Sequence, residues 1–222
     1  MIECKRIAAV VTTYFPNSHA GVLVSKFLTG FATDEGLLAP RTRIVSLFMD
    51  QFHDRDVGLQ LAHAHDVPVF SSIRAAMTLG GEELGVDAVL IIGEHGDYPL
   101  TALGQEMLPR RWFFEQVCGV IGEFDRPVPV FTDKHLSYRW QDAQWMYETA
   151  RQRRWRGPRP SAGPPVVAHG LFEEGSTDPL FEQDPLLAPI AASVTGHGRH
   201  RRSRQFRGQP DVFSLRPQSG EK

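Results

Sequence analysis

Short apolar segments alternate with amphipathic segments along the first 150 residues, and this alternation limits the possible folds more than any other feature of the sequence. The apolar segments are rich in β-branched residues, which is typical of strands buried on both faces of a sheet. We predict strands at Ile7–Val11, Arg43–Met49, Val67–Phe70, Asp87–Gly93 and Val128–Phe131. We predict helices at 18–31, Asp54–Ala64, Ile73–Leu79, Arg111–Phe124 and Trp140–Arg151. Alternating strands and helices are expected to form an α/β fold, a doubly wound and mostly parallel sheet with helices on both faces.

The composition of the chain changes near residue 151. Residues 1–150 hold 12 of the 24 basic and 19 of the 26 acidic residues, whereas the rest of the chain holds the other 12 and 7. We therefore predict a folded domain over 1–151 and a largely irregular tail over 152–222. The tail is rich in Arg, Pro, Gly and Ala, as a GC-rich gene read out of frame would be. We hypothesise that a frameshift near Arg151–Arg154 replaced a sixth strand and a further domain.

Several classes of protein are disfavoured by the sequence. No apolar run approaches the roughly 18–20 residues that span a bilayer, and the first residues do not resemble a signal peptide. The two cysteines, Cys4 and Cys118, form neither a disulfide framework nor a metal-binding spacing. Arginine clusters in the tail lack interleaved aromatic residues and any nucleic-acid motif. We expect a cytoplasmic protein with no membrane or nucleic-acid partner.

Polar and charged residues follow four of the predicted strands. In doubly wound sheets, ligands bind at the carboxyl ends of the strands, so these residues are the candidates for a site that binds a small molecule. They are Thr12, Thr13 and Asn17 after the first strand, Asp50 after the second, Gly93, Glu94, His95 and Asp97 after the fourth, and Asp133, Lys134 and His135 after the fifth.

Three motifs occur in an order that is similar to a known family. They are Ala64-His65-Asp66-Val67-Pro68-Val69-Phe70 after a strand that ends in Asp50, the strand Asp87–Ile91, and Asp133-Lys134-His135-Leu136-Ser137. Over about residues 5–151 the chain resembles the nucleotide-binding half of the glucose–fructose oxidoreductase / inositol dehydrogenase (Gfo/Idh/MocA) family. The resemblance implies a Rossmann-like fold and NAD- or NADP-dependent oxidation of a hydroxyl group on a sugar or polyol.

The resemblance also implies roles for the candidate residues. Lys134 matches the usual catalytic lysine of the family, and His135 replaces the proline that follows it. Asp50 would accept hydrogen bonds from the ribose hydroxyls of the adenosine, which favours NAD over NADP. Thr12, Thr13, Asn17, Gly93, Glu94 and Asp133 complete the expected cofactor site. The first turn departs from the family pattern, because it has no glycine before Gly21.

These departures leave three interpretations open. The first is an oxidoreductase of low or no activity that lacks the family's second domain, which supplies the oligomer interface and much of the substrate pocket. The second is a Rossmann-like binding module without catalysis. The third is a metal-dependent hydrolase or isomerase that uses Glu94, His95, Asp97, Asp133 and His135, although their spacing matches no specific metal motif and we assign no metal ligands.

Overall fold

A computed structural model of the chain describes residues 4–153 and 167–169. Its main sheet has six strands, all parallel, in the order β5-β4-β1-β6-β7-β8. The strands are β1 (Lys5–Val11), β4 (Thr42–Met49), β5 (Val69–Phe70), β6 (Ala88–Ile92), β7 (Val130–Thr132) and β8 (Val167–His169). The chain proceeds from β1 to one edge of the sheet and then returns to build the other edge. This order confirms the predicted doubly wound α/β fold.

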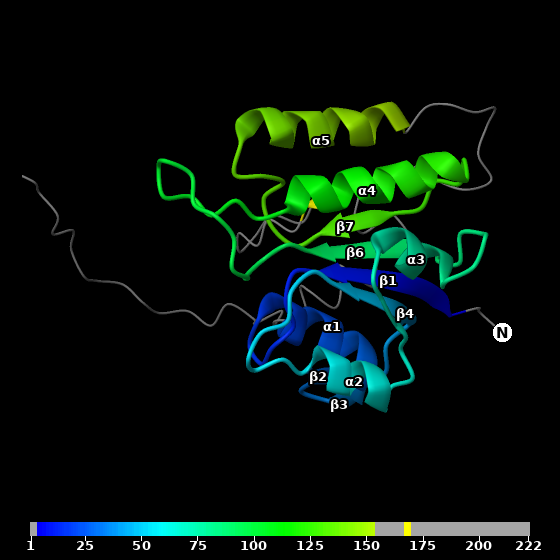
Figure 1. The fold of residues 1–222 in the computed structure, drawn as a ribbon. Coiled ribbons are helices and arrows are strands. Elements are labelled where there is room, and N and C mark those ends of the chain that lie inside the picture. The colour runs from blue at the N-terminus through cyan, green and yellow to red at the C-terminus, as the bar shows by residue number, and fades with distance from the viewer. Residues whose placement is uncertain (1–3, 154–166, 170–222) are drawn as a thin grey trace, which may run out of the picture.

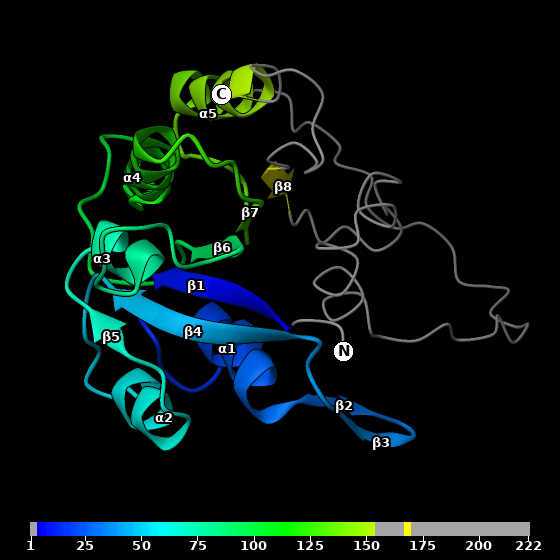
Figure 2. The same ribbon diagram turned by 90° about the vertical axis from the view of Figure 1, so that its right-hand side faces the viewer.

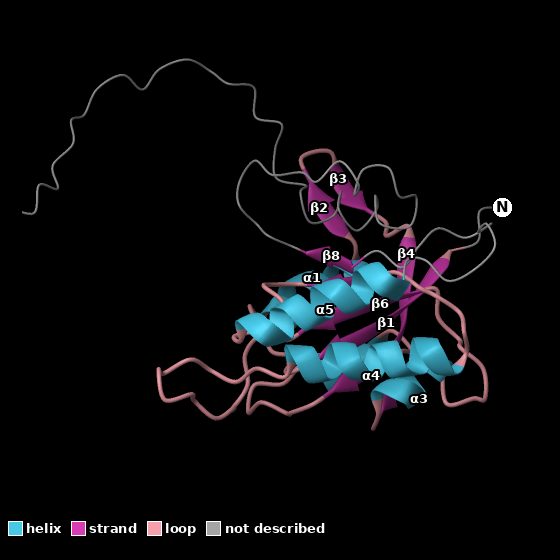
Figure 3. Ribbon diagram, turned by 90° about the horizontal axis from the view of Figure 1, so that it is seen from above, coloured by secondary structure: helices cyan, strands magenta, loops and turns pink. Residues whose placement is uncertain are grey.

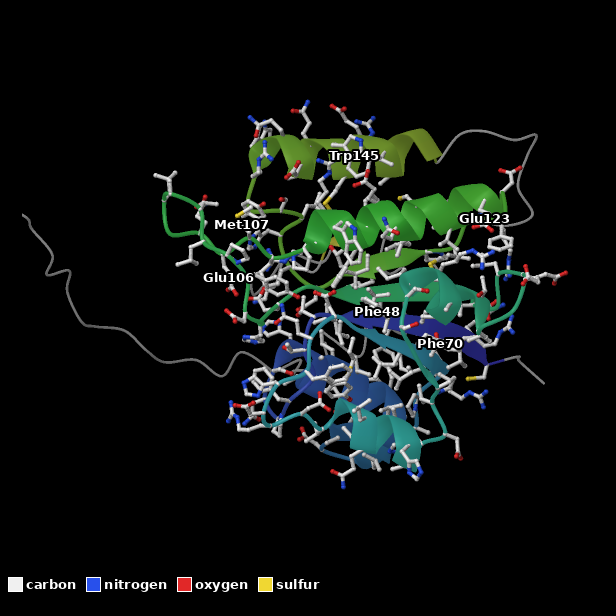
Figure 4. All side chains as sticks on the ribbon, viewed as in Figure 1. Phe48, Phe70, Glu106, Met107, Glu123 and Trp145 are labelled. Carbon is white, nitrogen blue, oxygen red and sulfur yellow. The ribbon has the colours of Figure 1, made fainter. Side chains whose placement is uncertain are left out.

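Helices cover both faces of the sheet. The helices α1 (His19–Thr29) and α2 (Gly58–Ala64) lie on one face, and α3 (Ile73–Thr78), α4 (Arg110–Glu123) and α5 (Trp140–Arg153) lie on the other side (Figures 1 and 2). Viewed from above, α4 and α5 run alongside each other (Figure 3). Trp145 of α5, which is labelled in Figure 4, contacts Phe114 of α4, with ring centroids 6.2 Å apart.

The central strand β1 contributes side chains to two separate cores. Ile7, Ala9 and Val11 pack into the core that contains α1 and α2. Ala8 and Val10 pack into the core on the other face, with α3, α4 and Met146 of α5. Burial on both faces explains why the strand is a continuous apolar run rather than an alternating one.

Two of the differences between the structure and the predicted elements lie next to α1 and α2. A small antiparallel hairpin, β2 (Phe31–Thr33) with β3 (Gly36–Leu38), follows α1 where we predicted the end of a helix and a loop. The second predicted helix begins at Gly58 rather than at Asp54, because the Val57 amide donates to the Tyr14 carbonyl, 2.9 Å away, and holds the preceding segment against the loop after β1. Strand β5, which directly follows Pro68, lies at an edge of the sheet, where a proline is tolerated.

A strand occupies the sixth position of the sheet within the range that we predicted to be a tail. Val167–His169 forms β8, which pairs in parallel with β7. The rest of 154–222 lies outside the described residues, so the domain boundary and the proposed frameshift stay predictions. None of the helices in the described part of the chain has the length and apolar character needed to cross a membrane.

Candidate functional site

The candidate residues lie at the carboxyl edge of the parallel sheet, on the left in Figure 1. The neighbouring strands β1 and β6 mark the point where the crossovers change direction, which is where ligands bind in this fold. Beside this edge, the loop between β6 and α4 extends outward and includes Glu106 and Met107 (Figure 4). The loops after β1, β4, β6 and β7 therefore supply the side chains of the candidate site.

The loop after β1 is held down by hydrogen bonds within the chain. The Thr12 hydroxyl donates to the backbone carbonyl of Glu94, 2.6 Å away. The Tyr14 side chain is fully buried, with its hydroxyl 2.9 Å from Ser25 Oγ. Burial raises the pKa of Tyr14 to about 12, although the hydrogen bond with Ser25 acts in the opposite direction. Tyr14 is thus a core anchor of the turn rather than a residue poised for ionisation.

Serine 18 caps helix α1 and uses its hydroxyl in doing so. Ser18 Oγ donates to the Phe15 carbonyl at 2.7 Å and accepts from the Gly21 amide at 3.0 Å. Of the residues of this turn that were expected in the cofactor site, Asn17 is exposed with a left-handed φ of 67°, and the buried Thr13 hydroxyl has no hydrogen-bond partner in the described structure. Most hydroxyl groups of this turn therefore already form hydrogen bonds within the protein.

Two residues after β4 hold two residues of the loop after β6. Gln51 Nε2 donates to the Asp97 carbonyl at 3.1 Å, and the Asp97 amide donates to Gln51 Oε1 at 2.8 Å. The Tyr98 hydroxyl donates to the Asp50 carboxylate at 2.7 Å, and burial together with this hydrogen bond raises the pKa of Tyr98. Because β1 lies between β4 and β6, these contacts cross the carboxyl end of β1. We call Asp50, Gln51, Asp97 and Tyr98 the bridge.

Aromatic packing fills the space beside the bridge. The Phe15 ring stacks on His53, which follows β4, with centroids 4.2 Å apart. The same ring lies 5.5 Å from the ring of His95, which follows β6. Gly96 has a φ of 134°, and a Cβ at this position would lie 2.3 Å from Tyr98 Cε2. The loop can fold back on Tyr98 only because residue 96 is glycine.

A buried arginine at the start of α4 organises a second group of contacts. Arg110 is only 4% exposed, and its guanidinium donates to the Gly93 carbonyl at 2.7 Å and pairs with the Glu94 carboxylate. A third nitrogen of Arg110 lies 2.8 Å from His135 Nε2, which must accept because arginine only donates. We call Gly93, Glu94, Arg110 and His135 the Arg110 cluster.

A histidine of α1 reaches across the sheet edge to the loop after β7. His19 Nδ1 lies 2.6 Å from Asp133 Oδ2, and the Asp133 side chain is 2% exposed. Burial raises the pKa of Asp133, and the nearby His19 opposes this shift. The His95 ring lies 5.4 Å from the His19 ring, and Lys134 is half-buried beside Asp133. We call His19, His95, Asp133 and Lys134 the β7 cluster.

The predicted residues thus divide into separate groups. Asp50 and Lys134 follow β4 and β7, which have two strands between them, or roughly 14 Å at the usual strand spacing. His19 and Arg110 were not predicted to belong to the site. The contacts of Gln51 with Asp97 and of Tyr98 with Asp50 were not predicted either. Gln51 and Tyr98 lie in loops that follow strands, and His19 is the first residue of α1, directly after such a loop; these positions were the available signal. Nothing in the sequence marks Arg110 as buried.

The two histidines His95 and His135 should make the fold less stable in acid. Partial burial lowers the pKa of both imidazoles, with a further contribution from His19 for the half-buried His95 and from Arg110 for the more exposed His135. Below the ordinary histidine pKa of about 6.5, the unfolded chain then binds more protons than the folded chain, so the free energy of unfolding falls as the pH falls. Urea unfolding at pH values of about 7.5 and 5.5 should show a smaller decrease for a variant with His95→Gln and His135→Gln than for the wild type.

The exposed His63 of α2 supplies the control for this experiment. The variant His63→Gln should keep the wild-type decrease between the two pH values. Asp133 has the opposite effect on the free energy of unfolding, because its raised pKa means that protonation favours the folded state. All the variants retain Asp133, so its contribution cancels in the comparison. An equal decrease in the double variant and the wild type would contradict the assignment.

The site does not fit a dinucleotide in the position that it takes in this fold. The pyrophosphate normally approaches the turn after the first strand, where glycines leave room for it. Here Phe15 packs between His53 and His95, and the bridge crosses the same place. Within residues 4–153 and 167–169, no three His, Cys, Asp or Glu side chains are arranged to hold a metal ion, so the metal-dependent interpretation gains no support.

Comparisons with known proteins concern the fold. No protein-family model matches this sequence, and no curated protein matches it significantly. Scyllo-inositol dehydrogenase from Lactobacillus casei matches in structure at 12% identity over 68% of this chain and 34% of its own, with a TM-score of 0.42. UDP-N-acetylglucosamine 3-dehydrogenase from Acidithiobacillus ferrooxidans matches at 14% identity over 68% and 35%, with a TM-score of 0.39.

A third match is biliverdin reductase from Synechocystis sp. PCC 6803, solved in complex with biliverdin and NADP+. Its identity is 15% over 66% of this chain and 34% of its own, with a TM-score of 0.39. This chain therefore spans about a third of the length of the structures that it matches. This likeness agrees with the resemblance expected from the sequence and concerns the fold alone.

Proposed function

We propose that this chain is a Rossmann-like module that binds a small molecule at the carboxyl edge of its sheet and does not carry out NAD- or NADP-dependent hydride transfer. The bridge is the observation that supports this proposal most directly. It engages both the Asp50 carboxylate and the Gln51 side chain with the loop after β6. A dinucleotide in the usual position would have to break these hydrogen bonds and displace the Phe15 ring.

The remainder of the edge is equipped to bind a smaller ligand. Lys134 is half-buried and has no ion pair or hydrogen bond within the described part of the chain. The His19 side chain is 31% exposed and is held by a buried carboxylate. A partly buried cation and an oriented imidazole that both neighbour Asp133 are a suitable arrangement for recognising a small polar molecule.

Calorimetric titration tests the proposal. We expect no saturable heat when NAD+ or NADP+ is added at concentrations up to about 1 mM, the upper end of ordinary KM values. A dehydrogenase known to bind the same dinucleotide, titrated in the same buffer, is the positive control. Saturable binding that disappears in the variant Asp50→Ala would contradict the proposal, because that carboxylate is the expected ribose ligand.

The second candidate function is an NAD- or NADP-dependent oxidoreductase acting on a hydroxyl of a sugar or polyol, with low activity. One observation favours it: the Asp50 carboxylate follows the second strand of the sheet and Lys134 follows the fifth, on opposite sides of the switch point. The titration above separates the two candidates. The sugar-like substrate, the oligomeric state and the cytoplasmic location expected from the sequence stay predictions.

A further inference from the structure

The His19–Asp133 pair is a hydrogen-bonded imidazole and carboxylate that the sequence did not reveal. The two residues are 114 positions apart in the chain, and α1 and the loop after β7 bring them to 2.6 Å. Asp133 is 2% exposed, whereas the His19 side chain is 31% exposed. One end of the imidazole is therefore fixed by the protein while the ring itself stays accessible.

The direction of this hydrogen bond determines what His19 offers to a ligand. An ionised carboxylate only accepts, so Nδ1 of His19 carries the proton and donates to Asp133. In the neutral imidazole, the other nitrogen, Nε2, then has an available lone pair and can accept a hydrogen bond from a hydroxyl group. Nε2 of His19 has no hydrogen-bond partner among the residues that the structure describes.

The charge next to the pair restricts the ligand further. Arg110 is committed to Glu94, to His135 and to the Gly93 carbonyl. Lys134 is the other cation of these two clusters. It makes no hydrogen bond or ion pair in the described structure, although its charge acts on Asp133 and opposes the raised pKa of that carboxyl. The carboxylates of Asp133 and Glu94 lie nearby, so a ligand with a single negative charge suits the site better than a doubly charged phosphate.

His95 adds an unsatisfied polar atom beside the pair. Its ring lies 5.4 Å from the His19 ring, and its Nε2 is buried without a hydrogen-bond partner in the described structure. A buried ring nitrogen without a partner is costly and calls for an explanation. A ligand that enters next to His19 can supply this partner with a hydroxyl group.

We propose that the β7 cluster binds a small carboxylate that carries a neighbouring hydroxyl group, with Lys134 pairing with the carboxylate and His19 Nε2 accepting from the hydroxyl. This inference rests on the proposed function, and it names the class of ligand that the module takes. The bridge limits the ligand to a small molecule, because the contacts between the loops after β4 and β6 close that side of the edge.

Three matched probes test the proposal: lactate, propionate, which lacks the hydroxyl, and 1,2-propanediol, which lacks the carboxylate. Each is titrated into the full chain while the ring nitrogens of the histidines are followed by NMR. We expect lactate to shift the His19 Nε2 resonance saturably. Propionate should bind about 3- to 10-fold more weakly, the effect of one net hydrogen bond. The diol should bind at least about 10-fold more weakly than lactate, because it lacks the charge.

Two variants assign the contacts. In His19→Gln the preference for lactate over propionate should disappear, and in Lys134→Met the preference for lactate over the diol should disappear. The controls are His63→Gln on α2 and Lys5→Met at the amino end of β1, which should keep both preferences. Circular dichroism confirms that each variant is folded.

A further measurement needs no ligand. In the wild type at neutral pH, the His19 Nδ1 resonance should be that of a protonated nitrogen and the Nε2 resonance that of an unprotonated one, and Asp133→Asn should remove this bias. The opposite tautomer, or lactate binding that is unchanged in His19→Gln, would overturn the proposal. Absence of lactate binding would overturn it too and leave the proposed function intact, whereas saturable NAD binding overturns the proposed function whatever lactate does.

Discussion

Replacing Arg110 with methionine is expected to lower the free energy of unfolding by about 3–5 kcal/mol, the usual loss when one partner of a buried ion pair is removed. Arg110 is 4% exposed, and its guanidinium contacts three groups, the Gly93 carbonyl, the Glu94 carboxylate and His135. Methionine fills much of the same space but leaves the Glu94 carboxylate without its counter-charge. Urea unfolding monitored by circular dichroism at neutral pH measures the loss.

The exposed pair Arg74–Glu123 is the matched control for this prediction. Its atoms approach to 2.6 Å, yet both side chains are 45% exposed. Exposed pairs contribute little to stability because water and salt screen them, so Arg74→Met should cost far less than Arg110→Met. The double variant Arg110→Met with Glu94→Gln should recover part of the loss, since it removes the uncompensated charge. Equal losses for the variants of Arg74 and Arg110 would contradict the role given to burial.

Arg110 also shows why the site was harder to predict than the sheet. The strands are short, apolar and rich in β-branched residues, which is the pattern that predicts a buried strand. Strand β6, which is buried along its whole length, shows this pattern most clearly. Arginine is mostly exposed in proteins, so its position before a helix gave no indication of burial. Gly93 packs closely against this arginine, because a Cβ at residue 93 would lie 2.5 Å from Arg110 Cγ. In the sequence, however, Gly93 is only a glycine after a strand, and nothing connects it with Arg110.

Long-range pairing explains the rest of the difference. Parallel strands place Asp50, Glu94 and Asp133 at one edge, which follows from the alternation of strands and helices alone. The partners of these carboxylates are Tyr98, Arg110 and His19, at separations of 48, 16 and 114 residues. No spacing rule connects residues so far apart. The hairpin β2–β3 escaped prediction for a simpler reason, since its short strands are largely exposed and have no apolar pattern to reveal them.

The second large effect is expected at Gly21, near the start of α1. A Cβ at this position would lie 2.3 Å from the Phe15 carbonyl oxygen and 3.3 Å from Ser18 Oγ. The clash is with backbone, which cannot rotate away, so Gly21→Ala should lower the free energy of unfolding by about 2–3 kcal/mol, as overpacking does. Thermal unfolding should show this loss even though alanine is the better helix former.

Gly119 in α4 provides the matched control for Gly21, because it is also a helical glycine but is exposed, and a Cβ there would meet no atom within 4 Å. Gly119→Ala should raise the free energy of unfolding by about 0.5–1 kcal/mol. If the two variants changed stability in the same direction, the close approach at Gly21 would be refuted.

The position of Gly21 also bears on function. In dinucleotide-binding turns some glycines make room for the pyrophosphate and the last one lets the helix pack closely. Gly21 serves the packing role alone. Tyr14 and Phe15 occupy the earlier part of the turn, where glycines would leave room for a pyrophosphate. The loop therefore keeps the glycine that its fold requires and lacks the glycines that would admit a pyrophosphate.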